Sequence, residues 1–256
     1  MCNKEKQIMN KPIILSLFFM MSLFFSAIPV HAASKKMNVI SKITYDDGSY
    51  DKYSYNKNGL IDKIKQYDSS GELSRQTSYH YNDKGLLSFY NDEPMNGIGH
   101  AVGYNLEYDE KGRLIQFDEG PFNRGGLTKY IYNNSKVVKI EEYSGMGTTY
   151  EGAYKVSYKK SRISKIGKTK YKYDKKGNLR KISGKDYTET YENTYKGSKL
   201  VKKYRKYSSS YGVETSSRKY SYKKIAVSKS YRKRIKKQQW VEKNEWWGPG
   251  ELLIFN

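Results

Sequence analysis

Cysteine is almost absent from this chain of 256 residues, since its one cysteine is Cys2. The rest of the chain has no thiol, which excludes disulfides, zinc–cysteine sites and cysteine nucleophiles from it. Proline is scarce, and the aromatic residues are 27 Tyr against 8 Phe and 3 Trp. A buried tyrosine must keep its hydroxyl hydrated or hydrogen-bonded. This composition therefore disfavours a thick, leucine-rich helical core.

The first 32 residues have the pattern of an export signal. Lys4, Lys6 and Lys11 precede the apolar run 13–25, and the small-x-small sequence at 30–32 ends in Ala32. The apolar run is shorter than the roughly 20 residues that span a bilayer. We expect cleavage after Ala32 or one residue later, with an uncleaved anchor as the alternative. The expected location is extracellular, in solution or at the wall of a bacterium.

One short pattern recurs along the rest of the chain. It consists of two tyrosines separated by one residue, then Asn or Asp, then Gly three residues later. Clear copies start at Tyr53, Tyr79 and Tyr171, and looser ones at Leu106, Tyr130 and Tyr220. In the first four copies the second tyrosine falls at 55, 81, 108 and 132. A regular spacing of this kind indicates a repeat architecture.

Each copy predicts a strand, a tight turn and a second strand. Tyrosines two residues apart lie on the same face of a strand. Asn or Asp followed by Gly three residues later favours a type I turn with Gly at positive φ. Further turn glycines at 48 and 71 complete an antiparallel meander. After the turn, Leu114 and Phe117 lie three residues apart, so they face opposite sides unless a bulge intervenes, and the sequence leaves both options open.

The predicted fold is all-β: an antiparallel meander of Tyr-rich β-hairpin repeats that forms an elongated, coiled or partly closed sheet. The repeat domain is expected over residues 33–239, and a Trp-rich cap over residues 240–256. We expect the cap to be an end strand that covers the open edge of the last hairpin. The alternative is a tryptophan platform for sugar rings or a lipid interface. The best helix candidate, at residues 232–242, is mostly charged.

The segments Tyr108-Asp109-Glu-Lys-Gly112-Arg-Leu114 and Tyr173-Asp174-Lys-Lys-Gly177-Asn-Leu179 resemble the YD repeat of the RHS-like secreted and surface proteins of bacteria. The resemblance covers roughly residues 45–225. It implies exported β-hairpin repeats, in some members associated with cell walls, carbohydrate binding or toxin encapsulation. It carries over no catalytic residue, and this chain is too short for a toxin-enclosing shell.

Charge is distributed unevenly. Residues 33–123 carry a net charge of −3, and residues 124–256 a net charge of +23. Lys172 lies between two tyrosines, so in a strand one face would be aromatic and the other cationic. A cationic face would attract polyanions, although surface lysines also simply solvate a sheet and block edge pairing. The candidate ligand-binding residues are Lys172, Tyr204, Arg205, Lys206, Tyr207, Arg218, Lys219, Lys223, Lys224, Trp240, Trp246 and Trp247.

The expected function is therefore noncatalytic binding, in which the basic half holds an anionic cell-wall polymer or glycan. A membrane surface is a further partner, and an extracellular nucleic acid is the disfavoured alternative because no nucleic-acid motif is present. The other alternative is a glycan-active or metal-dependent enzyme at the loop 92–103, around His100. We expect no catalytic residues, no metal and no cofactor.

Overall fold

The computed structural model describes residues 35–95, 102–118, 126–145 and 147–244, and the predicted signal at 1–32 lies outside them. Sixteen strands precede a short 3₁₀ helix, η2 (Lys229–Tyr231), and the helix α2 (Arg232–Asn244). The strands are β1 (Lys35–Tyr45), β2 (Tyr50–Tyr55), β3 (Ile61–Tyr67), β4 (Leu73–Tyr81), β5 (Leu87–Pro94), β6 (Val102–Tyr108), β7 (Leu114–Asp118), β8 (Leu127–Asn133), β9 (Lys136–Ser144), β10 (Thr149–Lys159), β11 (Arg162–Ile166), β12 (Thr169–Tyr173), β13 (Leu179–Ser183), β14 (Tyr187–Lys196), β15 (Lys199–Ser209) and β16 (Gly212–Val227).

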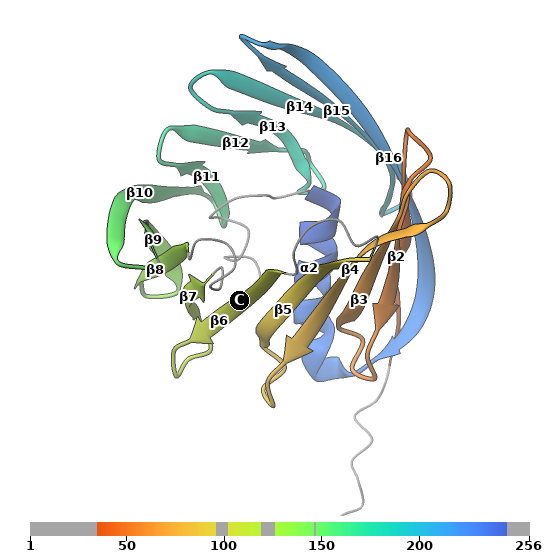
Figure 1. The fold of residues 1–256 in the computed structure, drawn as a ribbon, viewed down its shortest axis with the longest axis horizontal. Helices are drawn as coiled ribbons and strands as arrows, with labels where there is room; N and C mark the ends of the chain where they lie inside the picture. Colours follow the sequence, from red (N-terminus) through yellow and green to blue (C-terminus); the bar gives the residue numbers. More distant parts are fainter. Residues whose placement is uncertain (1–34, 96–101, 119–125, 146, 245–256) are drawn as a thin grey trace, which may run out of the picture.

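The strands form one antiparallel meander that closes into a barrel (Figure 1). Consecutive strands pair with each other, and β16 also pairs with β1 from Lys35↔Val227 to Tyr45↔Arg218. The meander was predicted, and the structure confirms it. The expected elongated, coiled or partly closed sheet is corrected to a closed one, because the first and last strands meet along their length and leave no edge strand at that seam.

The predicted turns are present. At Asp109 the carbonyl accepts a hydrogen bond from the Gly112 N–H at 2.8 Å, and its carboxylate accepts one from the Arg113 N–H at 2.8 Å. Gly112 has a φ of +73°, a conformation that glycine adopts without steric cost. The same arrangement recurs at the turns that begin with Asn56, Asn82 and Asp174. The Asx side chain thus fixes each turn, as the sequence pattern indicated.

A bulge follows each of these turns and decides the question that the sequence left open. Leu114 pairs with Tyr108, but Gln116 pairs with Glu107, so the residue between them is unpaired. The extra residue returns the following side chains to the inner face. Leu114 and Phe117 are therefore both buried. Equivalent register shifts occur at Tyr55, Tyr81, Tyr132, Tyr158, Tyr173 and Tyr195.

The second tyrosine of the repeat links one hairpin to the next. The Tyr81 hydroxyl at the end of β4 donates to the Ile61 carbonyl at the start of β3, at 2.6 Å. The same bond joins Tyr108 to Leu87, Tyr132 to Leu114, Tyr173 to Ile163 and Tyr222 to Leu200, at 2.7–2.9 Å. Each bond satisfies the hydroxyl that a buried tyrosine must pair. The repeat spacing is therefore set by a recurring hydrogen bond as well as by the turn.

The helix α2 lies inside the barrel, and its side chains bond to strands that are far apart around the ring (Figure 1). The side-chain oxygens of Gln239, Gln238 and Asn244 accept from the backbone N–H groups of Ile40 on β1, Ile61 on β3 and Leu179 on β13, at 2.6, 3.2 and 2.6 Å. These amide side chains satisfy backbone donors that would otherwise be buried without a partner.

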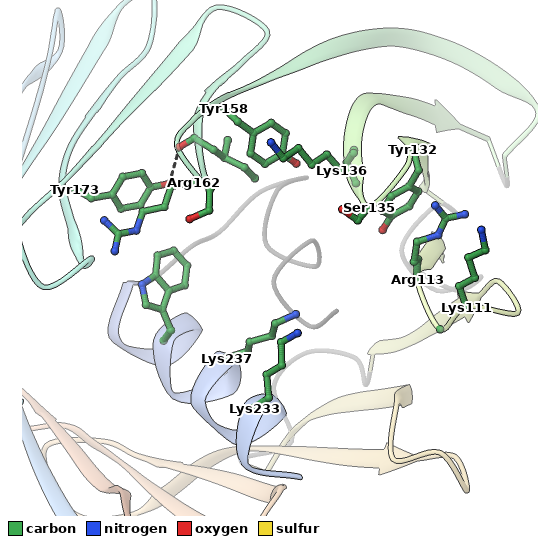
Figure 2. A pocket seen from close by; sticks show the side chains of 15 residues that line it. Lys111, Arg113, Tyr132, Ser135, Lys136, Tyr158, Arg162, Tyr173, Lys233 and Lys237 are labelled. Carbon is green, nitrogen blue, oxygen red and sulfur yellow. Dashed lines mark hydrogen bonds between the residues drawn. The ribbon is translucent and has the colours of Figure 1, made fainter. Parts of the chain in front are cut away.

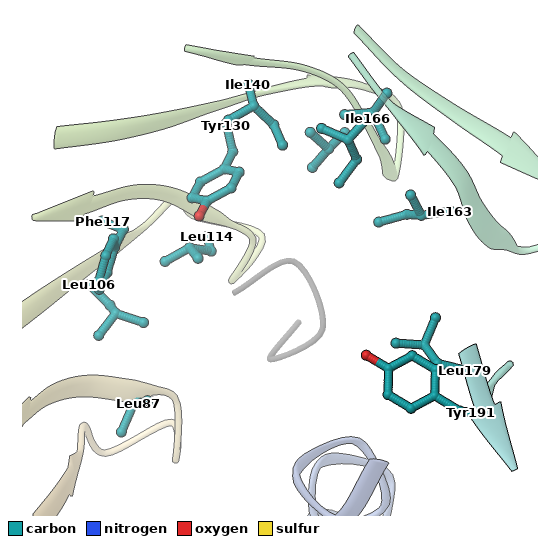
Figure 3. Packing of buried hydrophobic residues seen from close by; sticks show 12 residues of the cluster. Leu87, Leu106, Leu114, Phe117, Tyr130, Ile140, Ile163, Ile166, Leu179 and Tyr191 are labelled. Atoms are coloured by element: carbon teal, nitrogen blue, oxygen red, sulfur yellow. The ribbon is translucent and has the colours of Figure 1, made fainter. Parts of the chain in front are cut away.

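Apolar side chains line the inner face of the barrel wall (Figure 3). The largest cluster runs from Leu87 on β5 to Tyr191 on β14, and Trp240 of α2 packs against it. The division predicted at residue 240 falls within α2. Residues 240–244 of the predicted cap are therefore helical, and residues 245–256 lie outside the described residues.

Candidate polyanion-binding face

The outer surface of the basic half carries a row of three lysines and one threonine that crosses four strands. Lys172 on β12 pairs with Lys181 on β13, which pairs with Thr190 on β14, which in turn pairs with Lys206 on β15. The neighbouring row, with Tyr171 and Ile182, packs on the core cluster. Because side chains alternate between the faces of a strand, the lysine row faces outward. The expected separation of aromatic and cationic faces is present here.

Two more lysine pairs extend this row into a wider basic face. Lys165 on β11 pairs with Lys170 on β12, and Lys202 on β15 pairs with Lys219 on β16. We call the seven lysines together the outer basic face: Lys165, Lys170, Lys172, Lys181, Lys202, Lys206 and Lys219. Lys181 is half-buried, and the other six are exposed. None of the seven forms an ion pair with a carboxylate in the described part of the chain.

Like charges that face each other across a strand pair repel. On the outer basic face, two such pairs lie on the neighbouring strands β11 to β13, and a third pair joins β15 to β16. Neighbouring strands are about 4.8 Å apart, so the three steps from β12 to β15 separate the backbones of Lys172 and Lys206 by about 14 Å. One exposed carboxylate, Glu192, lies on the same outward side of β14, two residues from Thr190, and pairs with Tyr204. The face therefore presents repeated positive charge at a spacing that suits an extended polyanion.

The other predicted residues of β15 and β16 do not all belong to this face. Arg205 forms an ion pair with Glu189 at 2.8 Å, and Tyr207 stacks on Tyr187 with ring centroids 5.8 Å apart. The Arg218 guanidinium lies 4.8 Å from the centre of the Tyr45 ring. These three side chains are half-buried and have partners within the barrel wall. The structure therefore places Lys172, Lys206 and Lys219 together, with Tyr204 beside them, and sets Arg205, Tyr207 and Arg218 apart.

Lys223 and Lys224 lie further along β16 and are both exposed. The Lys223 Nζ lies 5.2 Å from the centre of the Tyr55 ring, and Lys224 pairs with Asn38. Trp240 lies on α2, where its indole N–H donates to the Gly177 carbonyl at 2.7 Å. Trp246 and Trp247 lie outside the described residues.

The residues considered for catalysis are described only in part. His80 is on β4 with its ring 5.5 Å from that of Phe89. His100 and residues 96–101 of the loop around it lie outside the described residues. Within the described ranges, no group of three or more His, Cys, Asp or Glu side chains could hold a metal ion. No helix in the described part of the chain is long and apolar enough to cross a bilayer.

Trp240 and a helix at 232–242 were named from the sequence, but it was not predicted that this helix lies inside the barrel and brings Lys233 and Lys237 there with Trp240. The cationic residues that directly follow three of the turns were also not named as candidate binding residues. Arg113, Lys136 and Arg162 each precede the first buried residue of a strand, namely Leu114, Val137 and Ile163. That recurring position is the signal that could have identified them.

Comparisons with known proteins found similarity to solved structures alone. No family model matches the chain, and no curated protein matches it. A crystal structure of TcdB2-TccC3-Cdc42 is similar over 70% of this chain and 11% of the other chain, with 13% identity and a TM-score of 0.36. A porin-like protein from Bacteroides uniformis is similar over 72% of this chain and 98% of its own, with 13% identity and a TM-score of 0.46. The chain thus spans about a tenth of the TcdB2-TccC3 chain that it matches.

Proposed function

We propose that this protein is an exported, noncatalytic binding protein of the YD-like repeat class, and that its basic half holds an anionic cell-wall polymer or glycan outside the cell. The outer basic face carries the proposal, because seven lysines gather there on neighbouring strands without a paired carboxylate in the described chain. The predicted signal at 1–32 supports export. The turns, bulges and tyrosine bonds that recur along the sheet support the YD-like assignment.

The energetic reason for polyanion binding is the repulsion among the lysines of the outer basic face. A polyanion laid across the lysine rows would neutralise several charges at once and release its own counterions. The interaction would weaken with salt, because exposed charges are screened within about 8 Å at physiological ionic strength.

The test is retention of the purified protein on isolated bacterial cell walls over a salt gradient. We expect retention at low salt and release as salt rises. The triple variant Lys172→Gln, Lys206→Gln, Lys219→Gln should release at clearly lower salt than the parent protein. Walls stripped of anionic polymer should retain the parent protein no better than they retain the variant.

The matched control variant removes three lysine charges from the near-neutral half, outside the outer basic face. Lys57, Lys63 and Lys84 are exposed and lie in the near-neutral half, so Lys57→Gln, Lys63→Gln, Lys84→Gln lowers the net charge equally. This control should release at the same salt as the parent. Equal effects of the two triple variants would show that net charge, and not this face, governs retention. Stronger competition by duplex DNA than by wall polymer would favour the nucleic-acid alternative.

A further inference from the structure

A cavity of about 640 Å³ lies between α2 and the hairpin ends of β6–β12 (Figure 2). Six of its lining residues are cations: Lys111, Arg113, Lys136, Arg162, Lys233 and Lys237. The volume is within the range of cavities that bind small molecules. No carboxylate is among the described residues that line it. The cavity is separate from the outer basic face and shares no residue with it.

Aromatic rings form much of the remaining wall. Tyr132, Tyr158, Tyr173 and Trp240 all line the cavity. The Tyr132 and Tyr173 hydroxyls donate to the Leu114 and Ile163 carbonyls at 2.8 and 2.9 Å. The indole N–H of Trp240 is held by the Gly177 carbonyl. The polar ends of these three side chains are bound to the barrel, so their rings are held in place. Rigid aromatic walls of this kind favour a ligand that has a ring of its own, because little ordering is needed on binding.

Five of the six cations that line the cavity form no ion pair with a carboxylate in the described part of the chain. The sixth, Arg113, forms an ion pair with Asp109 at 2.5 Å. Arg162 and Lys136 lie instead over the Tyr173 and Tyr158 rings. The two helical lysines, Lys233 and Lys237, are four residues apart on one face of α2, an arrangement in which like charges repel.

The pKa of Lys237 is shifted in the direction expected for a lysine near other cations. Desolvation, together with the charges of Lys233 and Arg234, lowers the pKa of Lys237 to about 8. A bound anion between the helix and the hairpin ends would stabilise the charged form of this lysine. The positive charges lie on opposite walls, with Lys233 and Lys237 on α2 and Arg162 and Lys136 on the barrel (Figure 2). A ligand with two anionic groups could contact both walls.

We propose that this cavity binds a small anionic carbohydrate, a sugar with at least two phosphate or carboxylate groups, whose ring packs between the fixed aromatic walls and whose charges contact Arg162 and Lys237. The electropositive C–H groups of a sugar suit the electron-rich faces of Tyr and Trp. Guanidinium and ammonium groups donate charge-assisted hydrogen bonds to phosphate and carboxylate alike. The proposal goes beyond polymer binding on the outer basic face and does not depend on it.

The experiment is titration calorimetry of the purified protein with three probes: a hexose bisphosphate, digalacturonate and the neutral disaccharide maltose. We expect saturable binding of at least one anionic probe and at least tenfold weaker binding of maltose. The probe that binds more tightly identifies phosphate or carboxylate as the preferred group. The double variant Arg162→Gln, Lys237→Gln should lose at least tenfold in affinity for that probe.

Two controls separate this site from the outer basic face. The Lys172→Gln, Lys206→Gln, Lys219→Gln variant should bind the small probe as the parent does, and the cavity variant should keep its retention on walls. Affinity for the probe should also fall as pH rises through about 8, where Lys237 loses its charge, and this fall should be smaller in Lys237→Gln. Absence of binding of both anionic probes, or equal binding of maltose, would overturn the proposal.

Discussion

At the scale of single residues, the second tyrosine of each repeat has two roles. Its ring packs toward the barrel interior, and its hydroxyl binds a carbonyl of the adjacent strand, as Tyr108 does with Leu87. Burial raises the pKa of Tyr108, so the hydroxyl stays protonated and remains a donor. The sequence predicted the ring's position from the alternation of a strand. It did not predict the carbonyl partner, because that residue is 21 positions away.

Replacing Tyr108 with Phe separates the contribution of the hydrogen bond to stability from that of the ring. The variant keeps the packing but leaves the Leu87 carbonyl without this donor, and we expect a loss of about 1 kcal/mol in the free energy of unfolding. Denaturant unfolding followed by circular dichroism measures it. The control is Tyr211→Phe, since Tyr211 is 99% exposed and should change stability by less than about 0.5 kcal/mol. Equal stability of the two variants would contradict the role assigned to the bond.

At the scale of elements, the least predictable part is α2. Its sequence is mostly charged and has no apolar stripe, so it does not read as a buried helix. It is accommodated because Gln238, Gln239 and Asn244 bind backbone N–H groups of the wall. The hairpins were predictable, since Asx and Gly residues specify each turn locally. The bulges were not, because a one-residue change of register leaves the sequence pattern of a strand almost unaltered.

The acidic residue Glu242 makes the docking of α2 dependent on pH. It accepts a hydrogen bond from the Tyr53 hydroxyl at 2.7 Å. The pKa of Glu242 is raised to about 7, mainly by desolvation; the Tyr53 hydrogen bond and Arg218 oppose the shift, and the Asp51 carboxylate adds to it. A carboxyl group whose pKa is raised by folding stabilises the folded state only while it is protonated. Stability should therefore decline as pH rises from about 4.5 to about 7.

The loss over this range should be no more than about 3 kcal/mol, from 1.36 kcal/mol for each pKa unit. Thermal unfolding at pH 5, 6, 7 and 8 measures it, with the largest losses below pH 7. The Glu242→Gln variant keeps an acceptor for Tyr53 and cannot ionise. Its stability should vary with pH by less than half as much over the same interval. An unchanged pH profile in this variant would exclude Glu242 as the cause.

At the scale of the whole molecule, closure depends on a pairing that no local pattern encodes. Each hairpin specifies its neighbour, but the meeting of β1 with β16 follows from the twist and the bulges summed over all the strands. This is why the sequence predicted the meander but not the barrel. It is also why the outer basic face was predicted only in part, since the orientation of each cation depends on register.

Closure can be tested with a cross-link, because the chain after Cys2 has no cysteine. Thr44 on β1 pairs with Lys219 on β16, so Thr44→Cys with Lys219→Cys in a Cys2→Ser background should oxidise readily. A bond that closes so long a loop should add about 2–4 kcal/mol of stability. Mass spectrometry and thermal unfolding report both effects. The control pair, Thr44→Cys with Lys206→Cys, lies on strands that are not neighbours and should stay reduced.

The pairing of β1 with β16 also sets an order of events in folding. The first strand cannot gain its second neighbour until the last strand exists, and their paired residues are more than 170 positions apart. Contacts between residues so distant in sequence form slowly, because a long loop must close before they contribute. The nascent chain therefore carries an unsatisfied N-terminal edge throughout its synthesis. We expect this delay to leave the growing polypeptide unclosed, and only a chain that has not yet closed could be threaded unfolded through a translocation channel.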